Sequence, residues 1–527
     1  MAKKANTSMK SASPEELLPV AVLFAELAES IGAKIDSDPT GAVEMVKNMR
    51  TDLISFGSLK GGTLIDAGAL LRDKSVIDEG VAIMRSLVER MHENLQVKYN
   101  LANGLIAQSD VVTYKSPAWY LVTADQRREA RVLFEKVGRG SGNESVGSTA
   151  LTNIGNAFWK AHRWAEAYDA YSDAIRIDPT NAVALTGAAR VLHRCIRLGI
   201  GQAACLQNVA RRHIEQARQH VNRIKELAGA KAMEELSLMF SGDPKQGSLP
   251  DMSKASDYQR FVASHRLALT ATIEGQNLSM KRWDSLRIES LIQSAIAIEP
   301  ITSSGVPPLF AMFNIMKADF LAARLLAFRG MTEKAEDSGE YSDTLDYALY
   351  GIDQSLLLLA QRSCIDVLDK IAVATSEYFG IPGKYANFSS RWFGDKTKGG
   401  ERHWHPLLEE AVNRGNVALV ALAELSLDIE SGGALFQKKA LRHSSTHRFT
   451  VLHDEGCSAS RASELVEHYR AREFESQLIS SLQLVRAALL YFVEMVRIEE
   501  AEKRKQLKGF VPSIEVPKHH YIRGHDD

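Results

Sequence analysis

Apolar and polar residues alternate with a helical period along most of this chain. Apolar positions recur three and four residues apart, which is the spacing of an amphipathic α-helix. Proline, which interrupts helices, accounts for only 14 of the 527 residues. In the C-terminal half this spacing predicts helices at residues 258–276, 285–298, 308–329, 343–380, 405–430, 433–447 and 460–505. We therefore predict an all-α protein.

Residues 148–181 have the spacing of one tetratricopeptide (TPR) repeat, a helix pair of about 34 residues. The residues at the pattern positions are Ile154, Gly155, Phe158, Ala167, Tyr171, Ala174 and Pro179. The small residues allow two antiparallel helices to approach closely, and Phe158 and Tyr171 fill the space between them. This segment therefore predicts a helix hairpin.

Weaker copies of the repeat begin at residues 61, 95 and 182. We predict TPR-like repeats over residues 61–240, preceded by an N-terminal helical cap at residues 1–60. An aromatic-rich insertion at residues 106–124 is expected to pack over the repeats, with partner binding as the alternative. Because repeat arrays offer an extended concave surface and rarely catalyse reactions, we expect a protein partner or trigger on the TPR surface.

Residues 241–257 are rich in Gly, Pro, Ser and Asp, which predicts a linker. It would be followed by a helical domain at residues 258–505 and a C-terminal tail at residues 506–527. In the last predicted helix, an apolar seam with steps of four and three residues comprises Leu478, Leu482, Val485, Leu489, Phe492 and Val496. Such a seam favours packing in a helical bundle, and a dimer contact is the second possibility.

Composition excludes several classes of protein. The 64 Lys and Arg residues nearly balance the 65 Asp and Glu residues, so nucleic-acid binding would need a local basic patch. The four cysteines form no C-x-x-C pair, which favours reduced thiols and a cytoplasmic protein. We expect no signal peptide, and no membrane association, because no apolar run approaches the roughly 18–20 residues that a membrane span needs.

Residues 436–449, FQKKALRHSSTHRF, contain the main cluster with chemical potential. Its charged and titratable residues are Lys438, Lys439, Arg442, His443, His447 and Arg448. On an ideal helix Arg442 and His447 lie about 140° apart, so the helix must end at the Ser-Ser-Thr run if both are to face one ligand. Three interpretations follow.

The first interpretation is a solvated basic helix end, which complements the negative end of the helix dipole. The second is a metal site, because His443 and His447 have helical ligand spacing and His403 and His405 could contribute. No H-E-x-x-H pattern or thiolate pair supports that second interpretation. The third is an R-x4-H ribonuclease motif formed by Arg442 and His447.

The third interpretation is favoured by a family resemblance. Arg442-His443-Ser-Ser-Thr-His447 resembles the R-φ-x3-H signature of the HEPN superfamily, in which φ is a polar residue. Further segments resemble motifs of a bacterial HEPN branch that is often fused to TPR repeats; they are Asn314-x2-Lys317, Ala323-Arg324, Arg362 and Asp369-Lys370-Ile371-Ala372. The resemblance spans about residues 258–505. It implies a TPR-type helical solenoid followed by a HEPN helical bundle.

The resemblance also implies an activity, namely metal-independent RNA cleavage by a homodimer or higher oligomer. Arg442, His443 and His447 would be catalytic, with attack by the substrate 2′-hydroxyl and no metal or other cofactor. Residues expected to bind RNA or support the site are Lys438, Lys439, Arg448, Asn314, Lys317, Asp369 and Lys370. For Asp369 and Lys370, the alternatives are positioning of Arg442 and a buried ion pair.

The biological role implied by the resemblance is antiphage defence or toxin-type growth arrest. The TPR repeats would restrain the HEPN site until a partner binds, with movement transmitted through residues 241–257. The alternative function is a catalytically inactive HEPN–TPR adaptor that binds RNA or a regulatory protein. RNA cleavage in the presence of a chelator distinguishes the two.

Overall fold

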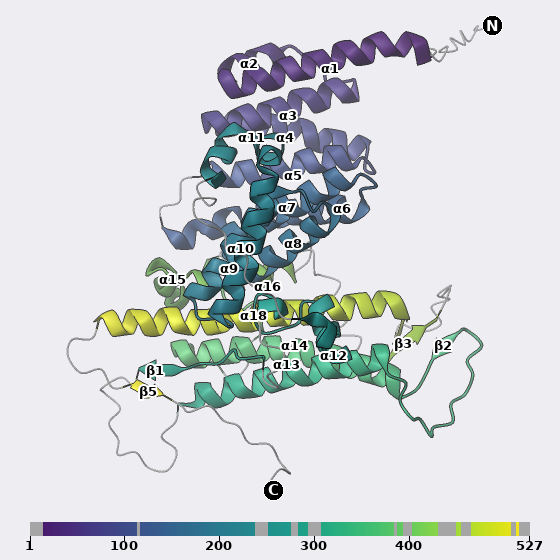
Figure 1. Cartoon of the computed structure of the whole chain (residues 1–527), viewed down its shortest axis with the longest axis vertical. Coiled ribbons are helices and arrows are strands. Elements are labelled where there is room, and N and C mark those ends of the chain that lie inside the picture. Colours follow the sequence, from purple (N-terminus) through teal and green to yellow (C-terminus); the bar gives the residue numbers. More distant parts are fainter. Residues whose placement is uncertain are drawn as a thin grey trace. The chain divides into compact units, whose positions relative to one another are not determined.

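The computed structural model describes residues 14–112, 116–237, 251–275, 283–292, 307–383, 387–393, 403–429, 449–454, 465–506 and 513–515. Helices dominate these residues and only short strands accompany them (Figure 1), so the predicted all-α class is confirmed. The chain divides into two compact units, Met1–Thr113 with Asp125–Gly140 and Tyr114–Ala124 with Ser141–Asp527.

The first unit is built from helices that pack on their neighbours in sequence. They are α1 (Pro14–Ser37), α2 (Pro39–Lys47), α3 (Ile54–Leu71), α4 (Lys74–Arg90), α5 (Leu95–Asp110) and α6 (Ala124–Gly140). The side chain of Asp73 caps α4 and that of Asn94 caps α5, which fixes where these helices begin. A Cβ on Gly80 would lie 2.8 Å from the carbonyl oxygen of Gly61, so glycine at this position allows α3 and α4 to touch.

The second unit begins with the strongest predicted repeat. Its helices are η1 (Pro117–Thr123), α7 (Glu144–Lys160), α8 (Trp164–Ile177), α9 (Ala182–Arg197), α10 (Ala203–Gln219) and α11 (Val221–Ser237). The α7–α8 hairpin is the helix pair that residues 148–181 predict. The ring of Tyr171 lies between Gly155 and Gly187, where an added Cβ would lie 2.6 Å and 2.7 Å from the ring. The assignment of these repeats as TPR stays a prediction.

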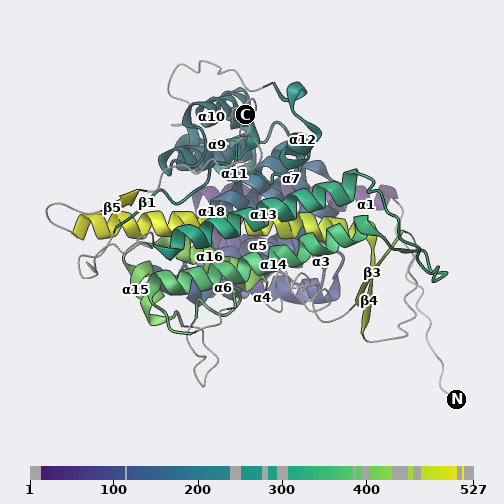
Figure 2. The same cartoon turned by 90° about the horizontal axis from the view of Figure 1, so that it is seen from below.

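The remaining helices of the second unit are longer. They are η3 (Met252–Lys254), α12 (Asp257–Ser264), η4 (Ile273–Gly275), α13 (Pro308–Thr332), α14 (Ile352–Phe379), α15 (Pro406–Asn413), α16 (Val417–Asp428) and α18 (Ala471–Gln506). Helices α13, α14 and α18 run side by side (Figure 2), and α16 packs against α18. Most of the seam from Leu478 to Val496 is fully buried in this bundle, and no seam residue is more than 1% exposed. The bundle interpretation of the seam is therefore confirmed, and the seam is not available for a dimer contact.

Two small sheets flank the bundle. Strand β3 (Phe449–His453) pairs with β2 (Ala348–Leu349) antiparallel and with β4 (Val466–Arg470) parallel. Strand β1 (Ser290–Ile292) pairs antiparallel with β5 (Ser513–Glu515). The first sheet lies near the beginning of α18 and the second near its end (Figure 1).

Several predicted helix boundaries are wrong. Residues 285–298 do not form the predicted helix where they are described, because the chain is extended and ends in β1. The predicted helix at 405–430 is two helices, separated at Gly415, whose φ of +106° interrupts a helix. The predicted helices at 258–276, 343–380 and 460–505 are shorter in the structure, which has α12, α14 and α18 in their place. The predicted helix at 433–447 lies outside the described residues.

Helix α8 is joined to the bundle by buried polar contacts. The indole nitrogen of Trp164 donates to Glu494 at 2.6 Å. Arg486 donates to Asp169 at 2.9 Å, and both side chains are largely buried. Since the repeat and the bundle share one compact unit, the predicted boundary at 241–257 does not coincide with the division between units. The predicted insertion was expected to pack over the repeats, but its η1 segment contacts the C-terminal helices α15 and α16, and the carbonyl of Ala118 accepts from the Trp404 indole at 2.9 Å.

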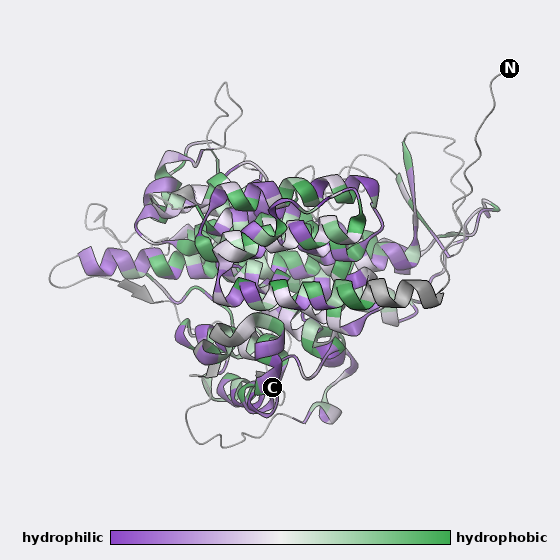
Figure 3. Ribbon diagram, turned by 90° about the horizontal axis from the view of Figure 1, so that it is seen from above, coloured by the Kyte–Doolittle hydropathy of each residue, from purple (hydrophilic) through white to green (hydrophobic). Residues whose placement is uncertain are grey.

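Hydrophilic and hydrophobic residues alternate along the helices (Figure 3), as the predicted amphipathic spacing requires. Within the described residues, α18 is the one helix that is long and apolar enough to cross a membrane by length and composition alone. The interior of the protein buries 83% of its most apolar 18-residue window. The expectation that no apolar stretch reaches that length is therefore wrong, but burial of this kind is typical of a core helix.

Candidate functional site

The basic cluster falls between two described elements. Lys438, Lys439, Arg442, His443, His447 and Arg448 all lie at residues 430–448, outside the described residues. The described chain reaches Ile429, directly after α16, and resumes at Phe449, the first residue of β3. The local structure that supports the motif therefore consists of the end of α16 and the start of β3.

Helix α16 is a core helix because it is buried on every face. All residues from Ala418 to Asp428 are buried. At its beginning, the Asn416 amide donates to Glu499 at 3.0 Å. At its end, Asp428 pairs with Nη1 of Arg163 at 2.5 Å. Breaking a buried ion pair leaves an uncompensated charge, so these contacts fix where the helix ends and the motif segment begins.

Strand β3 fixes the other side of the motif segment. The backbone N–H of Phe449 donates to the carbonyl of Leu465 at 2.9 Å. The Phe449 residue is 73% exposed, whereas Leu452 and His453 are buried. The C-terminal end of the strand is therefore buried. Its first residue, Phe449, lies at the surface two positions after His447.

Helix α13 carries the first set of predicted support residues. Lys317 donates from Nζ to the backbone oxygens of Asp284 at 2.6 Å and Leu286 at 2.9 Å, and burial lowers the pKa of Lys317. Burial opposes the charge of Arg324, but its ion pair with Asp284 at 2.6 Å outweighs this and raises the pKa of Arg324. These two cations bind the extended segment before β1. Lys317 donates hydrogen bonds to backbone carbonyls of this segment that would accept backbone N–H groups if the segment were a helix. Asn314 lies exposed on the same helix.

Helix α14 carries the second set. The carboxylate of Asp369 accepts from the backbone N–H of Phe388 at 3.0 Å. Lys370 forms an ion pair with Asp319 of α13 at 2.6 Å, with side chains 47% and 35% exposed. An ion pair is thus present for Lys370, but it is partly exposed rather than buried. Positioning of Arg442 by this pair of residues stays a prediction.

A small pocket with room for about 50 Å³, partly open to solvent, lies between α14, the turn at 387–389 and α18. Its walls include Gln361, Leu368, Asp369, Asn387, Ile429 and Ser481. Ile429 is the last described residue before the motif segment, so the pocket lies where the chain enters that segment. Gln361 is fully buried, and neither of its amide atoms has a hydrogen-bond partner in the described structure.

Comparison with known proteins identifies the C-terminal region. Residues 301–499 match the model of a protein family described as LA2681-like HEPN. This region is a HEPN domain. Among curated proteins, none matches the chain closely enough to indicate a relative. The predicted HEPN resemblance is therefore confirmed, and Arg442 and His447 lie inside the matched residues.

The HEPN domain brings the two sets of predicted support residues together. The matched range contains α13 and α14, which pack along each other. An ion pair joins Asp319 of α13 to Lys370 of α14. Asp319 is two residues after Lys317, and Lys370 directly follows Asp369. The first HEPN helix therefore also anchors, through Lys317, the extended chain at 283–289.

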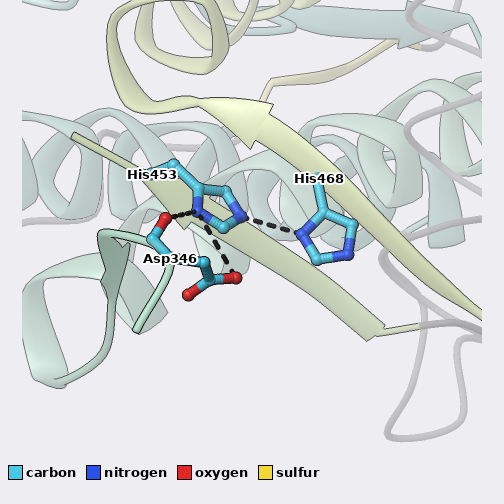
Figure 4. A group of neighbouring side chains, drawn as sticks. All are labelled: Asp346, His453 and His468. Atoms are coloured by element: carbon cyan, nitrogen blue, oxygen red, sulfur yellow. Dashed lines mark hydrogen bonds and ion pairs between the residues drawn. The ribbon is translucent and has the colours of Figure 1, made fainter. Parts of the chain in front are cut away.

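The described residues of the HEPN domain also contain a cluster with the donor set of a metal site. Asp346, His453 and His468 each offer a ligand atom, and these atoms lie within 4.8 Å of one another (Figure 4). His403 and His405, which the metal interpretation of the sequence included, do not belong to this cluster. The other two histidines of that interpretation lie outside the described residues.

Sequence reasoning missed the histidine cluster and the polar wall of the pocket. The three residues of the cluster come from the loop before β2, from β3 and from β4. They are too far apart in the sequence to form a short metal-binding motif. Gln361 directly follows the apolar run Leu356–Ala360 on α14. A polar residue on an otherwise apolar helix face is the one signal that could have identified it.

Proposed function

We propose that the chain is an endoribonuclease that cleaves RNA without a metal ion, at a site formed by two R-x4-H motifs in a homodimer. The observation that supports this most is the position of Arg442 and His447 within the residues that match the HEPN family. HEPN families include many ribonucleases, and HEPN domains often bind RNA and form dimers.

The proposed chemistry uses the side chains of the motif. A histidine side chain ordinarily has a pKa near 6.5, so His447 would be able to transfer protons to or from a ribose 2′-hydroxyl or a leaving 5′-oxygen near neutral pH. Arg442 offers a fixed cationic fork to the scissile phosphate. His443 would orient the phosphate or support His447. Attack by the substrate 2′-hydroxyl would leave a 2′,3′-cyclic phosphate.

The surrounding cations would hold the RNA strand in the proposed site. Lys438, Lys439 and Arg448 flank the motif in sequence. Phosphate contacts of this kind depend on salt, because each one releases counterions from the nucleic acid. With a net charge of −1, the chain has no general attraction for RNA, so this local cluster would supply most of the binding.

The test is an RNA-cleavage assay in EDTA with purified full-length protein. Arg442→Ala and His447→Ala should each lower the cleavage rate by roughly 10²–10⁴-fold, the usual contribution of acid–base and charge-stabilising groups. Replacing the nucleotide at the cut site with its 2′-deoxy form should block cleavage. The exposed residues Arg50 and His92 supply matched controls, Arg50→Ala and His92→Ala, which should cleave at the wild-type rate.

The outcomes separate the proposal from its alternative. RNA binding without cleavage in the wild type would identify an inactive adaptor. Cleavage at the wild-type rate in both motif variants would exclude the R-x4-H site. Sedimentation or light scattering during the same experiment tests the dimer, because a strictly monomeric protein that cleaves RNA contradicts a site shared by two chains.

We further propose that the helical repeats bind a protein partner that controls cleavage, in defence against phage or in growth arrest in the cytoplasm. The support is the division of the second unit into a repeat segment and a HEPN domain joined by α8–α18 contacts. Co-purification from cells with and without phage infection, followed by cleavage assays with the captured partner, tests this role.

A further inference from the structure

His453 is held in the orientation of a metal ligand. Its residue is fully buried at the end of β3. Its Nδ1 atom lies 2.9 Å from the backbone oxygen of Asp346, and a carbonyl oxygen can only accept a hydrogen bond. Nδ1 therefore carries the proton, and in the neutral ring Nε2 presents a lone pair. Metal-binding histidines use this arrangement, in which the second ring nitrogen donates to a carbonyl and fixes the ring.

The lone pair of His453 faces a second imidazole. Nε2 of His453 lies 2.8 Å from Nδ1 of His468, which comes from the neighbouring strand β4 (Figure 4). Without a metal, one proton on His468 Nδ1 bridges the two rings. Two nitrogens bound to one first-row metal at about 2.0–2.1 Å are separated by roughly 2.9–3.4 Å, depending on the bond angle. Metal binding therefore requires the two nitrogens to separate by up to about 0.6 Å, and each ring must also turn so that its nitrogen lone pair points at the ion.

The third donor is a carboxylate from a third segment. Asp346 precedes β2, and a carboxylate oxygen of Asp346 lies within 4.8 Å of a ring nitrogen of each histidine. Its side chain is 44% exposed, so it can rotate toward the histidines and leave room for water as a further ligand. Two imidazoles and one carboxylate suit Zn²⁺, Ni²⁺ or Co²⁺ better than Mg²⁺ or Ca²⁺. The donors come from three strand-forming segments and would be joined by one ion.

We infer that Asp346, His453 and His468 form a binding site for a divalent transition metal ion such as Zn²⁺, which crosslinks the three strands of the β2–β3–β4 sheet. On binding, His468 moves its proton from Nδ1 to Nε2 through solvent, and the metal takes its place beside His453. None of its three residues belongs to the R-x4-H motif, and the proposed cleavage uses none of them. Its role is to stabilise the sheet, and the inference holds whether or not the chain is a nuclease.

Metal binding is tested with tag-free full-length protein that has been stripped with EDTA and dialysed against Zn²⁺. The wild type should retain one Zn²⁺ per chain after gel filtration, and Zn²⁺ should raise its melting temperature. His468→Gln and Asp346→Asn should weaken Zn²⁺ binding at least tenfold. Both residues are at least partly exposed, and glutamine at position 468 keeps an N–H that can donate to Nε2 of His453, so these variants should keep the metal-free circular dichroism spectrum and melting temperature.

The motif histidines supply the matched control. The double variant His443→Gln/His447→Gln should retain full Zn²⁺ binding. Replacement of Zn²⁺ by Co²⁺ gives an independent readout, because bound Co²⁺ has a visible absorption band that His468→Gln should remove. Absence of bound metal in the wild type, unchanged binding in His468→Gln, or loss of binding only in the motif double variant would each overturn the inference.

Discussion

Single buried polar groups reveal where this protein is not optimised for stability. Gln361 has two amide atoms without partners in the described structure, at the wall of the pocket beside Asp369. An unsatisfied buried polar group costs about 1–3 kcal/mol. Because an unpaired buried amide lowers stability, its presence suggests a role other than stability. Substituting Gln361 therefore tests whether the pocket has such a role.

We predict that Gln361→Leu raises the free energy of unfolding by about 1 kcal/mol, because leucine fills a similar volume without unpaired polar atoms. Urea denaturation measures the effect. Gln483 is the matched control, since its amide donates to the carbonyl of His265 at 2.9 Å, and Gln483→Leu should lower stability. A lower stability for Gln361→Leu would show that the pocket holds a polar partner for this amide.

A second residue-scale prediction concerns His213 on α10. Both ring nitrogens are buried without a partner in the described residues, and burial lowers the pKa of His213 to about 4. The unfolded chain binds this proton near pH 6.5, whereas the native state binds it only near pH 4. Stability is therefore fully present above pH 6.5 and decreases as the pH falls from about 6.5 toward 4.

The variant His213→Leu should lose less stability over this pH range, by up to about 3 kcal/mol at pH 4. Burial also lowers the pKa of His162 to about 4, so part of the acid sensitivity should remain. Urea midpoints measured from pH 7 to pH 4 test the prediction. His92→Leu, at an exposed position, should follow the wild type across the whole range.

At the scale of helices, the contact of α7, α8 and α9 depends on two glycines around one ring. We predict that Gly155→Ala lowers the free energy of unfolding by about 1–3 kcal/mol, because its Cβ would meet the Tyr171 ring at 2.6 Å. Gly32 in α1 has no atom within 4 Å of an added Cβ. Gly32→Ala should therefore be neutral or stabilising, through its better helix propensity. Equal effects of the two variants would contradict this account.

The all-α fold could be predicted from the sequence because a helix that packs on one face has apolar residues three and four positions apart. The α7–α8 hairpin and the α18 seam followed from such spacing. Element ends were less predictable, because they depend on tertiary contacts. Lys317 takes the carbonyls of Asp284 and Leu286, and no local pattern in residues 283–292 reports a lysine that lies far along the chain.

The candidate site divides in the same way. The R-x4-H pattern and its HEPN setting were visible because they are local in sequence. The partners of Lys370 and Asp369 were not visible, since Asp319 and Phe388 reach them only through folding. The histidine cluster unites three segments across more than 100 residues, which no spacing rule detects.

For the whole molecule, the division into units predicts which fragments fold. Fragment 241–527 lacks α8 and so leaves Glu494, Arg486 and Asp428 buried without Trp164, Asp169 and Arg163 as partners. We predict that it aggregates or stays partly unfolded. Fragment 114–527, which keeps the second unit whole, should fold cooperatively. Circular dichroism melting curves and limited proteolysis distinguish the two.

This prediction bears on the expected control by the repeats. If fragment 241–527 fails to fold as predicted, removing residues 1–240 cannot test restraint by the repeats. Fragment 114–527 is the informative comparison with the full chain. If fragment 114–527 folds no better than fragment 241–527, the second unit is not an independently folding unit.

The pairing of Trp164 with Glu494 also has a consequence for protein synthesis. The two residues are 330 positions apart, so at about 5–20 residues per second the ribosome adds the second roughly 20–70 s after the first. Until α18 emerges, α13, α14 and α16 have no common core helix to pack on. A chain whose translation stops before α18 therefore cannot complete its bundle, and any activity that needs the bundle waits until the ribosome has added α18.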